Sequence, residues 1–262
     1  MPPDRSGRPR RAAGRPLVLV AHGSRDPRAA PSTRALARAV GAACPDARVE
    51  TAFLDFEGPG LAAALTREAA RGQRAATVVP LLLTAAYHGR VDVPGEIEKA
   101  GGLGLSIGLA PVLGPVAGAR ADAVALDLLV RALRRRLDEV LDFPVDGVVL
   151  AAAGTRQVSA LGTVDLVADA LGAALGVPCL AGYASGAGRG TGAAVTALRQ
   201  RGAHRIALSA YFLAPGLLYD RVVADARAAG AQVAAAPMGD APEIAELVLR
   251  RADTVTRAGT AA

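Results

Sequence analysis

The stretch LVLVAHGSRDP, residues 17–27, decides the fold, because five apolar residues lead directly into a histidine, a glycine and charged groups. A short apolar run with polar boundaries is typical of a buried strand. A related stretch, VVLAAAGTRQV, occupies residues 148–158. There Ala153 stands in the position of His22, while glycine, a hydroxyl residue and arginine follow in both stretches. The pair predicts that one strand-and-turn unit occurs twice in the chain.

The order of apolar and helical segments predicts an α/β fold. The first half has expected strands at Leu17–Ala21, Arg48–Leu54, Ala76–Leu83 and Leu105–Ala110, with helices such as Thr33–Gly41 and Leu61–Arg71 between them. The second half has expected strands at Val148–Ala152, Val177–Gly182, Arg205–Tyr211 and Gln232–Ala236. This alternation favours two similar lobes, each a mainly parallel sheet with helices on both faces.

Corresponding landmarks indicate an internal duplication. His22 and Ala153 are 131 residues apart, the segments PLLLTAAYH and AYFLAPGLL begin 130 apart, and APVLGP and APMGDAP begin 126 apart. With a seam in Leu141–Gly147, we expect an N-terminal lobe at residues 17–140 and a C-terminal lobe at residues 147–256. Two facing lobes predict a cleft, and open parallel sheets bind ligands beyond the carboxyl ends of their strands.

The net charge of +6 is concentrated at the N-terminus. Residues 1–16 contain five arginines and one aspartate, which accounts for +4 of the total. We expect this segment to be a disordered basic tail. Only 3% of the residues are aromatic, which argues against a stacking platform for nucleic acid. We therefore predict no nucleic-acid partner.

The sequence favours a cytoplasmic protein without a membrane span. Arg10 and Arg11 suggest a twin-arginine export signal, but the apolar run Leu17–Ala21 is shorter than the ~7–15 residues that an export signal needs. Charge, glycine or proline interrupts every apolar stretch before it reaches the ~18 residues of a span. Cys44 and Cys179 lie far apart without a CxxC motif, so neither a zinc knuckle nor a disulfide framework is indicated.

Polar residues follow three of the expected strands. His22 follows the first strand, Asp55 the second and His88 the third, so the three should converge at one edge of the sheet. Neutral imidazole binds iron, cobalt, nickel and zinc, and it is also a base near neutral pH. The alternative is that each histidine only caps a helix or bonds a backbone carbonyl. His204 precedes a strand and is expected to be structural or exposed.

Two motifs resemble those of a known family. AHGSRDP, residues 21–27, and PLLLTAAYHGRVDVP, residues 80–94, are similar to motifs of the sirohydrochlorin chelatases, the cobalt- and iron-inserting enzymes of cobalamin and sirohaem synthesis. YASGAG, residues 183–188, and AYFLAPGLL, residues 210–218, extend the resemblance over nearly the whole chain after the tail. The resemblance implies two related α/β lobes around a tetrapyrrole and a lyase-type metal chelatase that inserts Co²⁺ or Fe²⁺ into sirohydrochlorin.

The resemblance also implies roles for individual residues. His22 and His88 become the catalytic residues, which handle the metal and the pyrrole protons. The implied metal ligands are His22, His88 and Asp55, although the family often has glutamate where this chain has the shorter Asp55. Donors for the carboxylates of sirohydrochlorin are expected around the cleft, at Ser24, Arg25, Leu83, Thr84, Ala85, Ala86, Tyr87 and Arg189. We expect a monomer whose partners are sirohydrochlorin and a divalent metal substrate, with no tightly bound cofactor.

Three other motifs do not support competing functions. SGAGRGTG, residues 185–192, lacks both the Lys-Ser/Thr ending of a P-loop and the GxGxxG spacing. GLSIG matches the GxSxG nucleophile elbow, but its Ser106 lies in an apolar run that is expected to be a strand. AHG around His22 resembles the RHG of histidine phosphatases, but Ala21 stands where the phosphate-binding arginine is needed.

The second half lacks both histidines, with Ala153 in place of His22 and Leu218 approximately in place of His88. We interpret the C-terminal lobe as a wall and a carboxylate-binding surface; the alternative is that it only buries the sheet faces of the other lobe.

A non-catalytic tetrapyrrole or metal carrier is the competing function, and multiple turnovers would exclude it. Ligand type alone does not select the metal, so we expect insertion of both Co²⁺ and Fe²⁺.

Overall fold

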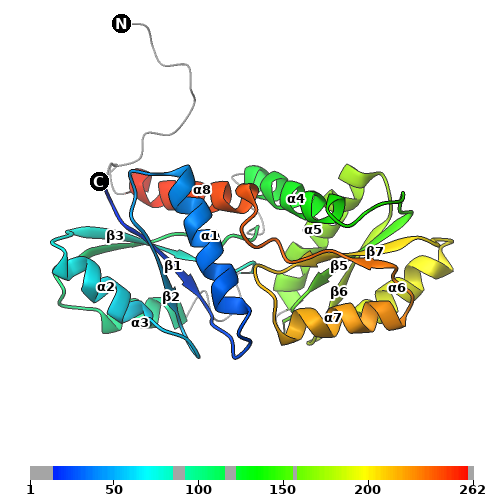
Figure 1. Ribbon diagram of the computed structural model, residues 1–262, viewed down its shortest axis with the longest axis horizontal. Helices are drawn as coiled ribbons and strands as arrows, with labels where there is room; N and C mark the ends of the chain where they lie inside the picture. Colours follow the sequence, from blue (N-terminus) through cyan, green and yellow to red (C-terminus); the bar gives the residue numbers. More distant parts are fainter. Residues whose placement is uncertain (1–13, 85–91, 116–121, 156–157, 259–262) are drawn as a thin grey trace, which may run out of the picture.

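The computed structural model describes residues 14–84, 92–115, 122–155 and 158–258, and it contains two parallel sheets (Figure 1). The first sheet has the order β2-β1-β3-β4, from β1 (Leu17–Ala21), β2 (Val49–Phe53), β3 (Ala75–Pro80) and β4 (Ser106–Leu109). The second has the order β6-β5-β7-β8, from β5 (Gly147–Ala152), β6 (Cys179–Tyr183), β7 (Ile206–Tyr211) and β8 (Val233–Ala234). The predicted pair of similar α/β lobes is confirmed.

A helix follows each strand. The helices of the first half are α1 (Ala29–Ala43), α2 (Leu61–Ala70), α3 (Val93–Lys99) and α4 (Ala123–Asp138). Those of the second half are α5 (Val158–Leu175), α6 (Thr191–Gln200), α7 (Leu217–Ala228) and α8 (Pro242–Ala258). Among the residues described here, none of the helices has the length and apolar character needed to cross a bilayer.

Some predicted element boundaries were wrong by a few residues. The α1 helix begins at Ala29 rather than Thr33, because Pro31 lies in its first turn, where a missing backbone N–H is tolerated. The β3 strand ends at Pro80 rather than Leu83, where its pairing with Val20 also ends. Ser106 is the first residue of β4, as the strand prediction required.

The last helix of each half packs against the other lobe. The α4 helix contacts α5 and β7, whereas α8 crosses back to α1, β3 and β4 (Figure 1). Leu128 and Leu133 of α4 and Ile244 and Val248 of α8 are buried in one core cluster, which includes residues of both sheets. This exchange of α4 and α8 between the lobes joins them through a shared hydrophobic core, which was not predicted from the sequence.

An arginine of each exchanged helix bonds it to the other lobe. Arg251 of α8 is buried; its Nη1 lies 2.8 Å from Asp122 Oδ1, and its Nη2 donates to the carbonyl oxygens of Leu113 and Gly114. On the other side, Arg136 of α4 donates to the Met238 carbonyl and lies 2.9 Å from Asp240 Oδ1. The two arginines hold corresponding loops, after β4 and after β8.

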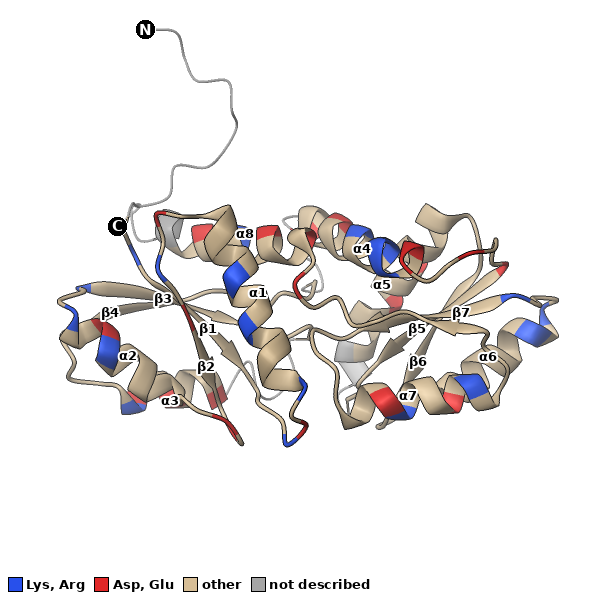
Figure 2. Cartoon of the chain, viewed as in Figure 1, with Lys and Arg blue, Asp and Glu red and all other residues tan. Residues whose placement is uncertain are grey.

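The central strand β1 is buried on both faces. Val18 and Val20 pack in the core below α2, while Leu17 and Leu19 belong to the shared core on the opposite face. A parallel strand that is covered on both sides leaves only its ends open to ligands. In Figure 2, basic and acidic positions are interspersed along the described helices and loops.

Candidate active site at the strand ends

His22 and Asp55 are neighbours at the carboxyl ends of β1 and β2. The strand ladder continues past both strands: Leu54 N donates to Ala21 O at 3.0 Å, and Asp55 N donates to His22 O at 2.9 Å. These bonds hold the two residues side by side, as the sequence predicted for residues that follow adjacent parallel strands. His22 is half-buried, and Asp55 is exposed.

The turn after His22 depends on Gly23. Its φ is +92°, a left-handed value that favours glycine, and a Cβ at this position would lie only 1.8 Å from the Asp55 carbonyl oxygen. The absence of a side chain lets the β2 loop pass directly over the turn. The close approach of backbone to backbone therefore fixes the spacing between the histidine and the carboxylate.

An aromatic ring completes this edge. Phe56 stacks on His22 with ring centroids 6.4 Å apart and planes inclined by 19°. The guanidinium carbon of Arg25 lies 4.9 Å from the centroid of the same ring, within the range of a cation–π contact. Phe56 was not predicted as a site residue. The sequence contains one indication of its role, since the corresponding residue of the second half, after Ser185, is Gly186.

The carboxylate of Asp55 bonds to the backbone and is also open to solvent. Its Oδ1 accepts a hydrogen bond from Phe56 N at 2.8 Å, and the side chain is exposed. Within the described ranges, no group of three or more His, Cys, Asp and Glu side chains is arranged to hold a metal ion. His88, the third predicted ligand, lies outside the described residues, so the three-residue ligand set stays a prediction.

The loop after His22 is tied to the second lobe. Asp26 N donates to Ser24 Oγ at 3.0 Å, and Arg28 forms two side-chain bonds to the Asp26 carboxylate, at 2.9 and 2.6 Å. Arg28 also reaches Asp220 of α7 at 2.5 Å. The side-chain bonds from Arg28, with a further one from its backbone N–H, lower the pKa of Asp26 to about 2. The sequence analysis did not identify this network.

The start of the β3 loop also contacts the second lobe. Leu83 and Thr84 are half-buried, and the Tyr211 hydroxyl donates to the Leu83 carbonyl at 3.2 Å. Leu113 N donates to Leu82 O at 2.8 Å, which holds the loops after β3 and β4 together. The remaining predicted residues of this loop, Ala85, Ala86, Tyr87 and His88, lie outside the described residues.

The second lobe repeats the backbone without the histidine. Gly154 has a φ of +91°, and a Cβ there would lie 1.9 Å from the Ser185 carbonyl oxygen. Ser185 Oγ donates to the Ala153 carbonyl at 3.1 Å. Arg189 is exposed on the same loop, with its own carbonyl oxygen bonded to Tyr183 N at 2.8 Å. Exposed Arg189 can reach an anion, whereas Ala153 offers no ligand atom on its side chain.

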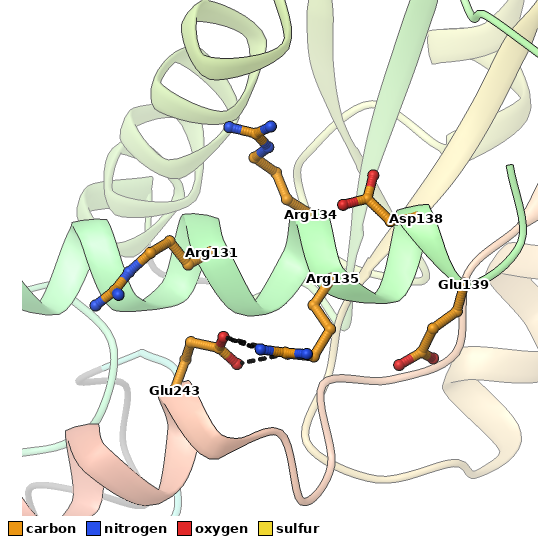
Figure 3. Close-up of a pocket in the computed structure, with 6 residues that line it drawn as sticks. All are labelled: Arg131, Arg134, Arg135, Asp138, Glu139 and Glu243. Atoms are coloured by element: carbon orange, nitrogen blue, oxygen red, sulfur yellow. Dashed lines mark hydrogen bonds and ion pairs between the residues drawn. The ribbon is translucent and has the colours of Figure 1, made fainter.

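A cavity of about 470 Å³ lies elsewhere, between α4 and the start of α8 (Figure 3). It is lined by Arg131, Arg134, Arg135, Asp138, Glu139 and Glu243. Arg135 and Glu243 form a paired contact at 2.7 Å, and this pairing lowers the pKa of Glu243. Opposite charges that neutralise one another on two packed helices indicate a structural contact rather than a reaction centre.

His204, the third histidine, is exposed next to β7, as expected.

The CbiX family model matches the chain at residues 16–121 and 147–255, one segment in each half. None of the curated proteins compared with the chain matches it. SirB from Bacillus subtilis with Fe³⁺ superposes with a TM-score of 0.78 at 20% identity, covering 94% of this chain and 98% of that chain.

Two further structures share the fold. The sirohydrochlorin chelatase SirB from Bacillus subtilis subspecies spizizenii in complex with cobalt gives a TM-score of 0.73 at 20% identity and covers 93% of this chain and 96% of that chain. CbiX, described as the terminal enzyme for biosynthesis of siroheme in denitrifying bacteria, gives a TM-score of 0.61 at 22% identity. The match covers 92% of this chain and 99% of that chain. At these identities the likeness establishes a common architecture.

Proposed function

The chain belongs to the CbiX family, and we propose that it inserts a divalent metal, Co²⁺ or Fe²⁺, into sirohydrochlorin. The observation that carries the proposal is the half-buried His22 beside the exposed Asp55, at the carboxyl ends of two adjacent strands. The similar SirB structure is that of a sirohydrochlorin chelatase and the similar CbiX structure that of a terminal enzyme for biosynthesis of siroheme, and both support the same reaction.

The chemistry requires a weak metal ligand and a base. Insertion exchanges two pyrrole protons for the metal ion, and the ion must lose its bound water. An imidazole such as His22 can hold the ion loosely and accept a proton near neutral pH. In the proposal His88 acts as the second imidazole, and Asp55 adds negative charge. Few ligands suit a transfer, because a closed four-ligand site would retain the metal.

The substrate carries carboxylates, which need donors around the site. Ser24 and Arg25 follow His22 after a single glycine, and Leu83 and Thr84 directly precede Ala85, Ala86, Tyr87 and His88 in the sequence. We assign Arg189 of the second lobe to the same task, because it is exposed on the loop that corresponds to the one bearing Asp55. The second lobe then serves as a binding wall.

We further propose a cytoplasmic monomer that needs no tightly bound cofactor, since the metal is a substrate. Imidazole and carboxylate ligands bind Fe²⁺, Co²⁺ and Ni²⁺ with increasing affinity and do not select among them by type. Both Co²⁺ and Fe²⁺ should therefore be inserted. Parallel kinetics would contradict this if one ion were preferred by more than about a thousandfold.

The test is turnover by substoichiometric protein. Sirohydrochlorin and Co²⁺ are incubated with the wild type and with His22→Ala, His88→Ala and His204→Ala, while the absorbance of the macrocycle is followed. Many turnovers by the wild type and His204→Ala, with a loss in the other two, support the proposal. One stoichiometric binding signal without turnover would instead establish a carrier. Normal turnover by both His22→Ala and His88→Ala would exclude the assigned centre.

A further inference from the structure

Phe56 occupies an unusual position for a large apolar side chain. It is 49% exposed, although it lies in the loop directly after Asp55. None of the hydrophobic core clusters of the described residues includes it, so its position is not explained by packing in the core. Within the described residues, its ring stacks on His22 and makes a cation–π contact with Arg25.

The backbone at Phe56 is strained. Its φ is +63°, and among the described residues it is the only one other than glycine with a positive φ. The corresponding residue of the second lobe is Gly186, with a φ of +90°. The correspondence is secured by Gly23 and Gly154, whose missing side chains meet the carbonyl oxygens of the residues just before Phe56 and Gly186. One lobe therefore relieves the strain with glycine, while the other retains a bulky ring.

The ring and the histidine are both absent from the second lobe, where Ala153 and Gly186 stand in their places. Strained residues that are not glycine persist at functional sites when the strained conformation serves a function. We propose that Phe56 is a positioning residue, whose ring holds the His22 imidazole in one orientation beside Asp55. This inference rests on the proposed function, since it names the residue that orients the metal-carrying imidazole.

The consequence for catalysis follows from the directionality of the imidazole nitrogen. A metal ion binds along the lone pair in the plane of the ring, so rotation of the ring moves the ion away from the macrocycle. A misplacement of about 1 Å can cost about a hundredfold in rate. Because loss of the stack leaves His22 present but less well oriented, we expect kcat to fall roughly tenfold, with little change in KM for sirohydrochlorin.

Four variants separate orientation from folding. Phe56→Ala and Phe56→Gly both remove the ring, but only glycine relieves the backbone strain, so the glycine variant should melt about 2–4 °C above the alanine variant. Both should lose turnover to the same extent, whereas Phe56→Tyr should retain it. Leu166→Ala is the matched control, because Leu166 is 46% exposed on α5 of the second lobe. Turnover within twofold of the wild type for both Phe56→Ala and Phe56→Gly would overturn the inference.

A second measurement does not depend on turnover. The chain has only three histidines, so the ring resonances of His22 can be assigned by NMR with a His22→Ala variant. Loss of the ring current of Phe56 would shift these resonances by itself, so the readout is the side-chain rotamer of His22, from its three-bond couplings and NOEs. One rotamer should give way to an average over several in Phe56→Gly and persist in Leu166→Ala. If the wild type fails to insert metal, the proposed function is lost, but the NMR comparison still decides whether Phe56 orients His22. A single His22 rotamer in Phe56→Gly, the same as in the wild type, would refute the inference.

Discussion

The loops after β1 and β2 and the loops after β5 and β6 have the same backbone geometry but different side chains. The φ values of Gly23 and Gly154 differ by one degree, and in each lobe a Cβ would lie less than 2 Å from the carbonyl oxygen of Asp55 or Ser185. Contacts between backbones persist after a duplication because almost any substitution at the glycine breaks them. Side chains at the rim are under no such constraint.

Under the proposed function, the difference in side chains separates the edge that reacts from the edge that does not. Ser185 donates its hydroxyl to the Ala153 carbonyl, so this polar group of the β6 loop is bonded to the neighbouring β5 loop. Asp55 instead presents an exposed carboxylate next to His22. The proposed ligands therefore lie in one lobe only, and the following substitutions test whether the second lobe can take over their role.

The largest effect is expected at the histidine itself. His22→Ala should lower kcat by about 10²–10⁴-fold, the usual contribution of a positioned acid or base. Adding the reverse change, Ala153→His, to His22→Ala should not restore turnover, because Ser185 stands in the position of Asp55. Single and double variants are compared by metal insertion at substoichiometric enzyme. Recovery in the double variant would mean that the second lobe retains a complete site.

The glycines are expected to give equal effects on stability. Gly23→Ala and Gly154→Ala should each lower the free energy of unfolding by about 4 kcal/mol, since each combines a left-handed φ with a backbone clash. Only Gly23→Ala should also reduce kcat, because it displaces the loop that carries Asp55. Urea unfolding and turnover are measured on both. A variant as stable as the wild type would show that the close approach is not needed.

The sequence predicted the strands, the parallel sheets and the duplicated turns because buried strands leave a continuous apolar pattern. It also placed His22 and Asp55 at one edge, since adjacent parallel strands end together. It did not predict the exchange of α4 and α8, because either lobe would present a similar apolar surface to these amphipathic helices. Nor did it identify Phe56, whose role depends on a backbone conformation that leaves no local pattern.

The helix exchange gives a third comparison, between Arg251 and Arg136. Arg251→Met removes a buried cation that bonds Asp122 and two loop carbonyl oxygens, so we expect a loss of about 3 kcal/mol in the free energy of unfolding. Arg136→Met should cost only about 1 kcal/mol, because Arg136 is more exposed and its partner Asp240 faces water. Urea unfolding of both variants provides the measurement. Equal losses would indicate that burial of the ion pair does not determine how much it contributes to the free energy of unfolding.

The smallest effect is expected at the network that ties the β1 loop to α7. Arg28 bonds Asp26 and Asp220, whereas the positions that correspond to Asp26 and Arg28 in the second half of the sequence are Gln157 and Ser159. Asp26→Asn should therefore lower the free energy of unfolding through the first lobe alone, by an amount that depends on pH.

The sign of that dependence follows from the pKa of Asp26. Hydrogen bonds from Arg28 lower it to about 2 in the folded chain, below the roughly 3.9 of an unfolded aspartate. Stabilisation is therefore complete above about pH 5 and is lost as the pH falls through about 2. The stability difference between the wild type and Asp26→Asn should be constant from pH 5 to pH 7 and should shrink steadily below about pH 4. Asp220→Asn should give a smaller difference that high salt removes, because that carboxylate is exposed. Urea unfolding at a series of pH values measures both, and a gap that persists unchanged at pH 2 would show that the ionised Asp26 carboxylate does not hold this loop.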